Sequence, residues 1–158
     1  MGELILLINT VAKTVGVSPA LLVAICMTET NLRNVHVMND GGSPSYGVCQ
    51  VKLETAQFMG KVFKKKKVQA YTSEDMKKVE KNLKVAALYV KYQINRYDGD
   101  LCKAVAAYNA GSFRESSRYE GRPFNWKYVE KVRSNLEDEH LTAQLDCGPV
   151  DSALALNK

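Results

Sequence analysis

Apolar residues recur along most of the chain at the spacing of amphipathic helices. Positions 4, 7, 8, 11, 12 and 15 are apolar, which predicts a first helix near the start. Ser18-Pro19 then pairs an N-cap residue with proline at the first helical position, so a second helix begins there and ends near Glu29. Apolar positions 83, 86, 87, 90 and 94 predict a long helix, with a start signal at Ser73-Glu74-Asp75.

The remaining pattern adds shorter helices and two breaks. We expect a short helix over 53–59, a compact one over 101–109 closed by Gly111, and a last one over 126–135. Turn-forming residues predict a loop over 34–46, and residues 61–71 lack a clear period and fit either a loop or a frayed helix. The chain therefore reads as mainly α, with one domain over 1–135 and a loosely docked tail over 136–158.

Composition excludes several classes of protein. No apolar run reaches the roughly 18–20 residues that span a bilayer. Residues 4–8 resemble a signal-peptide core, but Glu3 precedes them, no Lys or Arg flanks them and no cleavage site follows cleanly. We therefore expect no signal peptide: the chain is made in the cytoplasm, and it either acts there or leaves by a route that needs no signal.

The four cysteines are far apart and lack the spacing of zinc ligands, so we expect no metal and no cofactor. Cys26 and Cys102 lie among apolar residues and are expected to be buried thiols. Disulfides are not excluded, although nothing in the spacing requires them.

Charge is distributed unevenly. The chain has a net charge of +5, whereas residues 61–84 alone carry nine lysines against three acids. Such a basic segment favours an anionic polymer as a partner over a small metabolite. The run Lys64-Lys65-Lys66-Lys67 is therefore expected either to bind such an anionic polymer or to form a solvated face.

Three segments carry candidate chemistry, namely 28–31, 46–51 and 107–111, and each is a weak signal alone. Glu29 stands out because it follows the apolar run 22–27 near the end of a helix that must be largely buried. A carboxyl group there is partly desolvated, which raises its pKa and suits it to act as a general acid near neutral pH.

In this order and spacing, the segments resemble the catalytic domain of lytic transglycosylases, the soluble-transglycosylase family related to goose-type lysozyme. The resemblance covers about residues 4–133. Glu29-Thr30-Asn31-Leu32 is similar to the family's Glu-Ser-x-aromatic segment, and Gly47-Val48-Cys49-Gln50 to its Gly-Leu-Met-Gln segment. Further matches are Val15 to Leu22, Thr55-Ala56, Asn82 with Ala86 and Tyr89, the unchanged Ala107-Tyr108-Asn109-Ala110-Gly111, and Tyr128-Val129 with Val132.

The resemblance implies a lysozyme-like α+β fold and a reaction on peptidoglycan. Glu29 would protonate the glycosidic oxygen between N-acetylmuramic acid and N-acetylglucosamine. It would then take the proton of the muramic 6-hydroxyl as a 1,6-anhydro ring closes. Tyr108 would hold Glu29 by a hydrogen bond. Substrate-binding positions would be Thr30, Tyr46, Gly47, Gln50, Asn109 and Tyr128.

The chain departs from the family pattern at Cys49, which stands where methionine is usual, and Asp40 leaves an alternative open. Goose-type lysozymes carry an aspartate in the corresponding loop, so Asp40 with Glu29 would make the chain a hydrolytic muramidase. Asp40 also fits a role in ordering the Gly41-Gly42 turn, or a solvated loop charge.

Other functions explain less of the sequence. A catalytically inactive wall-binding module leaves Glu29, Gln50 and Tyr108 unexplained, and a nucleic-acid-binding protein would show aromatic residues among the lysines or a helix-turn-helix. We therefore expect a monomeric enzyme whose partner is peptidoglycan rather than nucleic acid. The missing signal peptide is typical of a bacteriophage endolysin that lyses its host.

Overall fold

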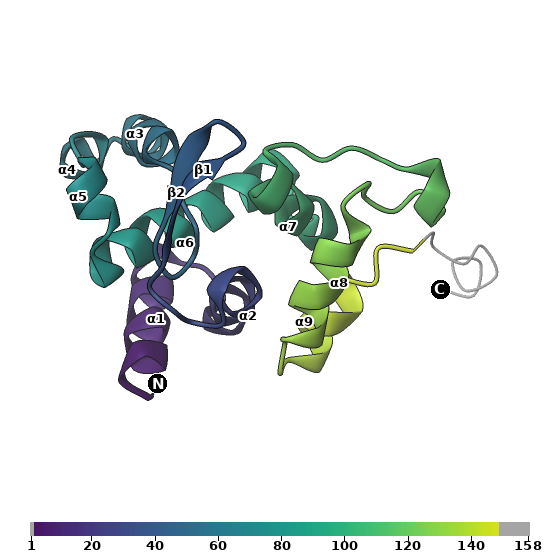
Figure 1. The fold of residues 1–158 in the computed structure, drawn as a ribbon. Helices are drawn as coiled ribbons and strands as arrows, with labels where there is room; N and C mark the ends of the chain where they lie inside the picture. Colours follow the sequence, from purple (N-terminus) through teal and green to yellow (C-terminus); the bar gives the residue numbers. More distant parts are fainter. Residues whose placement is uncertain (1, 149–158) are drawn as a thin grey trace.

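The protein is mainly α-helical, as predicted, and the computed structural model describes residues 2–148. Helices α1 (Gly2–Val15) and α2 (Pro19–Thr30) are joined by a short turn, contact each other and cross at a large angle (Figure 1). The Ser18 hydroxyl accepts a hydrogen bond from Leu21 N at 3.2 Å, so the predicted cap is confirmed. No helix among residues 2–148 combines the length and apolar character needed to cross a bilayer.

Helix α6 (Val79–Arg96) is the centre of the fold, since α1, α3, α5 and α7 all pack against it. It starts six residues later than predicted, because a separate short helix, α5 (Ser73–Met76), precedes it. Thr72 and Asp75 cap α5 reciprocally. Lys78 between the two helices is extended, with φ −83° and ψ 129°, so α5 does not continue into α6. The Met76 carbonyl accepts a hydrogen bond from Asn82 Nδ2 at 3.0 Å.

The predicted loop over 34–46 is instead an antiparallel hairpin of β1 (His36–Asp40) and β2 (Ser43–Tyr46). Its strands were missed because β1 is almost wholly exposed and therefore lacks the alternation of apolar and polar positions that marks a half-buried strand. Asn39 and the glycines at 41 and 42 form the turn, where both glycines have positive φ. The hairpin stands over the middle of α6 (Figure 1).

Helix α3 (Leu53–Val62) is slightly longer than predicted, and α4 (Lys66–Gln69) forms within the segment that lacked a clear period. The two helices touch so closely that a Cβ at Gly60 would lie 2.2 Å from the backbone nitrogen of Gln69. The absence of a side chain at this glycine therefore allows α4 to fold back on α3.

The C-terminal part contains α7 (Leu101–Ala110), a 3-10 turn η1 (Ser117–Tyr119), α8 (Trp126–Ser134) and α9 (Glu139–Gln144). The end of α7 before Gly111 and the position of α8 are as predicted. Residues 136–148 are docked more firmly than expected. Helix α9 packs on α8, Leu145 is fully buried, and Arg133 Nε donates to the Thr142 carbonyl. The rest of the expected tail, 149–158, lies outside the described residues.

All four cysteines form disulfides, so the expectation of free thiols is wrong, although Cys26 and Cys102 are buried as predicted. Cys102 pairs with Cys147 and ties the segment after α9 to α7. Cys26 pairs with Cys49 and ties α2 to the turn that follows β2. The apolar surroundings were read correctly, but spacing alone cannot identify a partner that is distant in the sequence.

Candidate active site

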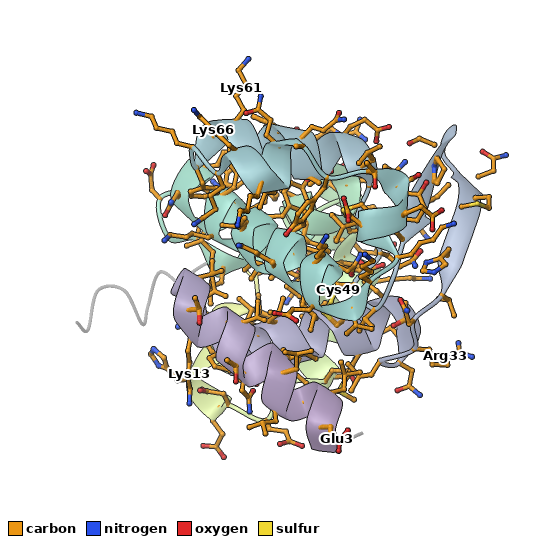
Figure 2. All side chains as sticks on the ribbon, turned by 90° about the vertical axis from the view of Figure 1, so that its left-hand side faces the viewer. Glu3, Lys13, Arg33, Cys49, Lys61 and Lys66 are labelled. Carbon is orange, nitrogen blue, oxygen red and sulfur yellow. A yellow bond between two sulfur atoms is a disulfide. The ribbon has the colours of Figure 1, made fainter. Side chains whose placement is uncertain are left out.

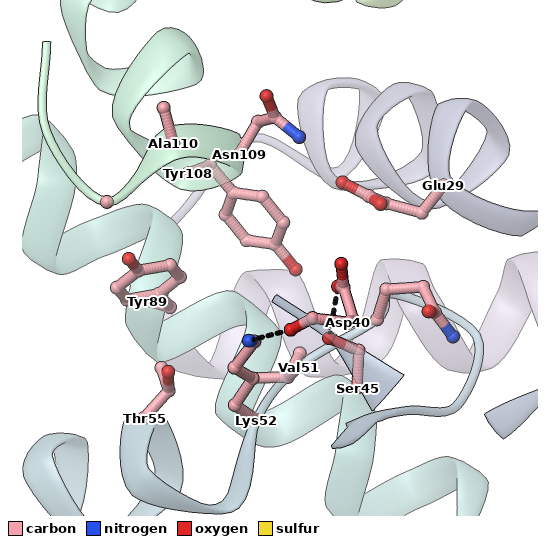
Figure 3. Close-up of a pocket in the computed structure, with 12 residues that line it drawn as sticks. Glu29, Asp40, Ser45, Val51, Lys52, Thr55, Tyr89, Tyr108, Asn109 and Ala110 are labelled. Carbon is pink, nitrogen blue, oxygen red and sulfur yellow. Dashed lines mark hydrogen bonds between the residues drawn. The ribbon is translucent and has the colours of Figure 1, made fainter. Parts of the chain in front are cut away.

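A pocket of about 300 Å³ opens where α2, the hairpin, α6 and α7 meet (Figure 3). The side chains of Glu29, Asp40 and Tyr108 converge on one space within it. The pocket thus brings together three segments that the sequence placed far apart. Its lining residues are Glu29, Asp40, Ser45, Gln50, Val51, Lys52, Thr55, Tyr89, Tyr108, Asn109, Ala110 and Gly111.

Glu29 lies in the last turn of α2 and is partly buried. Its pKa is raised from 4.5 to about 7, mainly by desolvation and to a smaller extent by the nearby charge of Asp40. A hydrogen bond from Tyr128 and the charge of Lys131 act in the opposite direction, but burial dominates. Glu29 can therefore carry a proton near neutral pH, which is the property predicted from its position after an apolar run.

Tyr128, rather than Tyr108, holds the Glu29 carboxyl group. Its hydroxyl donates to Glu29 Oε2 at 2.7 Å, whereas the Tyr108 hydroxyl donates to the Cys49 carbonyl at 2.8 Å. Burial raises the pKa of both tyrosines well above the usual value, with the nearby Glu29 carboxyl contributing, so both hydroxyls stay protonated. The predicted hydrogen bond to Glu29 thus exists, but it comes from α8 instead of α7, and Tyr128 does not line the pocket.

The turn over 47–50 forms the floor beside Glu29 and is held by Asn82, which is fully buried. Asn82 Nδ2 donates to the Tyr46 carbonyl at 2.7 Å, and its Oδ1 accepts from Cys49 N at 3.2 Å. Gly47 has a φ of +80° and leaves no room for a side chain, because a Cβ there would lie 2.5 Å from the Asn82 side chain. The family motif included Asn82, but its role as the support of this turn was not predicted.

Three predicted substrate-binding residues lie behind the pocket rather than in it. Thr30 is buried and donates to the Val48 carbonyl at 2.6 Å, which joins the end of α2 to the floor turn. Tyr46 is buried in the core, and Gly47 shapes the turn through its backbone. All three position the residues of the site without lining the pocket.

Gln50 and Asn109 do line the pocket, as predicted. Gln50 Nε2 donates to the carbonyls of Val35 and Gly47 at 2.9 and 3.0 Å, so this amide also braces the floor. Asn109 is exposed, and its Oδ1 accepts a hydrogen bond from Asn125 at 3.0 Å. Within residues 2–148 the amide nitrogen of Asn109 forms no hydrogen bond, so it is free to donate to a ligand.

Asp40 reaches the pocket from β1 and lies close enough to Glu29 to affect its pKa. Ser45 donates to its Oδ2 at 2.7 Å, and Lys52 Nζ donates to the Asp40 carbonyl (Figure 3). Lys52 Nζ also donates to the Ser43 hydroxyl at 2.9 Å. Asp40 is therefore oriented by its neighbours, although its side chain is exposed. Within residues 2–148, no three His, Cys, Asp or Glu side chains are grouped so that they could hold a metal ion.

Several site residues had no predicted role. Lys52 and Ser45 orient Asp40, and Thr55 and Tyr89 line the far side of the pocket. Thr55 and Tyr89 belonged to the matched motifs, which could have identified them. Lys52 and Ser45 carried no comparable signal, because their contacts depend on a hairpin that was read as a loop.

The arrangement suits acid/base chemistry on a ligand with many hydroxyl and amide groups. One carboxyl group titrates near neutral pH and is oriented by a tyrosine that stays protonated. A second, exposed carboxylate lies near it, and amides of Gln50 and Asn109 surround the same space. Such a pair of carboxyl groups, only one of them held in a desolvated position, is typical of sites that cleave glycosidic bonds.

Comparisons with known proteins agree with this geometry. The family model of the transglycosylase SLT domain matches residues 6–128. No curated protein matches the chain in sequence. Two similar solved structures are an inactive mutant of the lytic transglycosylase Slt from Pseudomonas aeruginosa and the 70 kDa soluble lytic transglycosylase from Escherichia coli.

The Pseudomonas structure is 15% identical with a TM-score of 0.57, and the Escherichia structure is 17% identical with a TM-score of 0.55. They match 89% and 88% of this chain, but the chain spans only 22% of each of theirs. These likenesses show the lysozyme-like fold that the resemblance implied, and the family model covers most of the chain. The chain belongs to the transglycosylase SLT domain family.

Proposed function

We propose that the chain is a lytic transglycosylase that cleaves the β-1,4 bond between N-acetylmuramic acid and N-acetylglucosamine in peptidoglycan. The observation that carries this proposal is Glu29, whose pKa is raised to about 7 in a pocket of a chain that belongs to this family. A glutamic acid that keeps its proton near neutral pH can donate it to a glycosidic oxygen.

In the proposed reaction, protonated Glu29 gives its proton to the oxygen of the N-acetylglucosamine that leaves. The muramic C1–O bond breaks through an oxocarbenium-like state, which the N-acetyl group of the substrate assists. Glu29, now ionised, removes the proton from the muramic 6-hydroxyl, and that oxygen bonds to C1 to form the 1,6-anhydro ring. The acid is thereby restored and no water is consumed.

The surrounding residues would serve this cycle through position. Tyr128 donates a hydrogen bond that favours the ionised form of Glu29, which suits the moment after proton transfer. Burial favours the protonated form that starts the cycle. A pKa near 7 balances the two states and lets one residue act first as acid and then as base. Asn109 and Gln50 would hold polar groups of the sugars.

A second candidate function is hydrolysis, which Asp40 favours. Its carboxylate lies in the same pocket as Glu29 and is oriented by Ser45. If the two carboxyl groups leave room for a water between them, Asp40 would orient that water for attack on C1, as in glycosidases that use two carboxyl groups. The product would then be an ordinary reducing sugar.

Mass spectrometry of digested peptidoglycan distinguishes the two reactions. We expect muropeptides that end in 1,6-anhydro-muramic acid, each lighter by one water than the hydrolytic product. Products that all carry a reducing end would identify a muramidase instead. Failure of the purified protein to release any muropeptide would overturn the proposed function.

We further propose that anionic polymers of the envelope bind at Lys64-Lys65-Lys66-Lys67, whose side chains are all exposed. The two disulfides support action outside a reducing cytoplasm, since such bonds persist in oxidising surroundings. The phage origin, the role in host lysis, the monomeric state and the lack of a nucleic-acid partner stay predictions.

A further inference from the structure

A second hollow, of about 350 Å³, lies beside the catalytic pocket between α3 and α6. The two share Thr55, Tyr89 and Gly111, so a chain that leaves the pocket on this side passes directly into the hollow. Arg96 and Glu54 lie at its edge, and aromatic side chains form much of its wall. The hollow is therefore a continuation of the catalytic pocket and has a different lining.

Aromatic rings form a row from the pocket into this hollow. The rings of Tyr108 and Tyr89 have centroids 5.2 Å apart, and those of Tyr89 and Tyr92 are nearly parallel at 6.3 Å. Phe58 packs edge-on against Tyr92 at 5.3 Å, with 42% of its surface exposed. Aromatic rings that line a hollow suit the apolar faces of sugar rings, and they lose little conformational entropy on binding.

A third, shallower hollow continues from Phe58 along the outer face of α3. It has a volume of about 600 Å³ and is lined by Gln57, Phe58, Lys61, Val62 and Gln69. Phe58 thus belongs to both outer hollows, and Lys61 lines the third one. From Thr55 to Lys61 the helix rises about 9 Å, at 1.5 Å per residue.

The third hollow leads to a group of five lysines, which we call the lysine cluster: Lys61 and Lys64 to Lys67. Its backbone is fixed, because Val68 is fully buried and Lys65 N donates to the Gly60 carbonyl at 2.8 Å. The close contact of Gly60 with Gln69 keeps α4 against α3. Figure 2 shows Lys61 and Lys66 pointing outward from the same edge of the molecule.

The charges of this cluster are not neutralised by any acid in the part of the chain that the structure describes. Among residues 2–148 none of the five lysines forms an ion pair, and residues 61–72 contain no acid. Lys77 and Lys81, farther along the chain, are instead paired with Glu74 and Asp75. The lysine cluster therefore keeps a concentrated positive charge that is complementary to an anionic ligand.

We propose that the outer face of α3 is a binding track for the same glycan strand that enters the catalytic pocket. The strand continues over Tyr89, Tyr92 and Phe58, and the carboxylates of its attached peptides meet the lysine cluster. This inference rests on the proposed function, because it takes peptidoglycan as the ligand. It follows from two properties of the track, namely its continuity with the pocket and its change from aromatic to basic lining.

The first test measures binding without cleavage, with Glu29→Gln as the background. Sacculi freed of phosphate polymers are the ligand, in low-salt buffer. Changing Lys64, Lys66 and Lys67 to Gln should weaken binding about tenfold, or about 1.4 kcal/mol. Changing Lys13, Lys78 and Lys84 to Gln removes the same charge outside the track and should leave affinity nearly unchanged. Added salt should remove the difference between the two triple variants.

Two outcomes of this test would overturn the proposal. Equal losses in both triple variants would mean that only the net charge matters. A dependence on the lysine cluster that appears only on sacculi that retain their phosphate polymers would assign the lysines to those polymers. Because this test measures no cleavage, neither result bears on the proposed reaction. If the parent protein binds in this way but never cleaves peptidoglycan, the proposed function is wrong and the binding track still stands.

The second test examines the aromatic part of the track. In the Glu29→Gln background, affinity for uncross-linked glycan strands should rise with strand length as longer strands reach Phe58. Phe58→Ala should abolish most of this rise. Phe124→Ala is a matched control, because Phe124 is 39% exposed and lies outside the three hollows. An unchanged length dependence in Phe58→Ala would show that the strand does not follow α3.

Discussion

Two carboxyl groups share one pocket but lie in opposite surroundings. Glu29 projects from the last turn of a helix whose other residues are mostly buried, and its partner Tyr128 is itself largely enclosed. Asp40 projects from an exposed strand, and its partners Ser45 and Lys52 belong to the hairpin and the turn after it. Burial raises the pKa of Glu29 to about 7, and Asp40 adds its charge from the solvent side.

The difference teaches which property each position contributes. A proton donor must hold its proton near neutral pH, and the desolvated position lets Glu29 do so. An exposed carboxylate can influence its neighbour through charge or hold a polar ligand, and its influence weakens in salt. The two residue types are chemically alike, so the surroundings rather than the side chains separate their functions.

The largest effect is expected from removing the titrating group on the buried side. Glu29→Gln keeps the shape and can still accept a hydrogen bond from Tyr128, but it cannot donate and recover a proton. We expect a loss of roughly 10²- to 10⁴-fold in muropeptide release, the usual contribution of general acid–base catalysis. Circular dichroism should show an unchanged fold. Retained activity would mean that another group supplies the proton.

The same variant should be more stable than the parent protein at alkaline pH. An unfolded glutamate titrates near 4.5 and folded Glu29 near 7, so the folded state keeps a proton that the unfolded chain has lost between these values. Stability therefore falls as pH rises through this window. Glu29→Gln should gain about 1–3 kcal/mol relative to the parent at pH 8 and little at pH 4. Urea unfolding at both pH values checks this, and a gain independent of pH would contradict it.

Tyr128→Phe tests the hydrogen bond on the buried side. The Tyr128 hydroxyl favours the ionised carboxylate, so its removal should raise the pKa of Glu29 above about 7. The alkaline limb of the pH–activity profile should then move to higher pH, while activity falls about tenfold because the carboxyl group is less well oriented.

Tyr108→Phe is the matched control for this shift. It removes a hydroxyl that donates to the Cys49 carbonyl, so the alkaline limb should stay in place. If Tyr108→Phe moves the limb and Tyr128→Phe does not, the assignment of the hydrogen bond is reversed.

The smallest effect is expected on the exposed side. Asp40→Asn removes a negative charge that raises the pKa of Glu29, so the alkaline limb should move slightly to lower pH. The shift should shrink as salt is added, because the charge is exposed. Anhydro products should persist in this variant. If Asp40→Asn is inactive and the parent protein releases hydrolytic products, Asp40 has a direct role in the reaction.

The buried side was the more predictable of the two. The apolar run before Glu29 predicts a buried helix, and burial is the largest cause of the raised pKa of Glu29. Its hydrogen-bond partner could not be predicted, because Tyr128 is 99 residues away and the choice between Tyr108 and Tyr128 depends on how α7 and α8 are oriented. Local sequence carries no such information.

The exposed side was predicted less well. Strand β1 has no apolar face, so the hairpin that presents Asp40 resembles a loop in sequence. The disulfide of Cys26 and Cys49 was missed for a related reason, since it joins α2 to the floor turn across 23 residues. Pairings of this kind are properties of the assembled fold.

The position of Glu29 along α2 has a consequence of its own. Aligned peptide dipoles give a helix a partial negative charge at its C-terminal end, which disfavours an anion there. Glu29 is in the last turn of α2, so the backbone of its own helix helps it to keep the proton. The same glutamate one helix length earlier, at the positive end, would be favoured as a carboxylate and would make a poor proton donor.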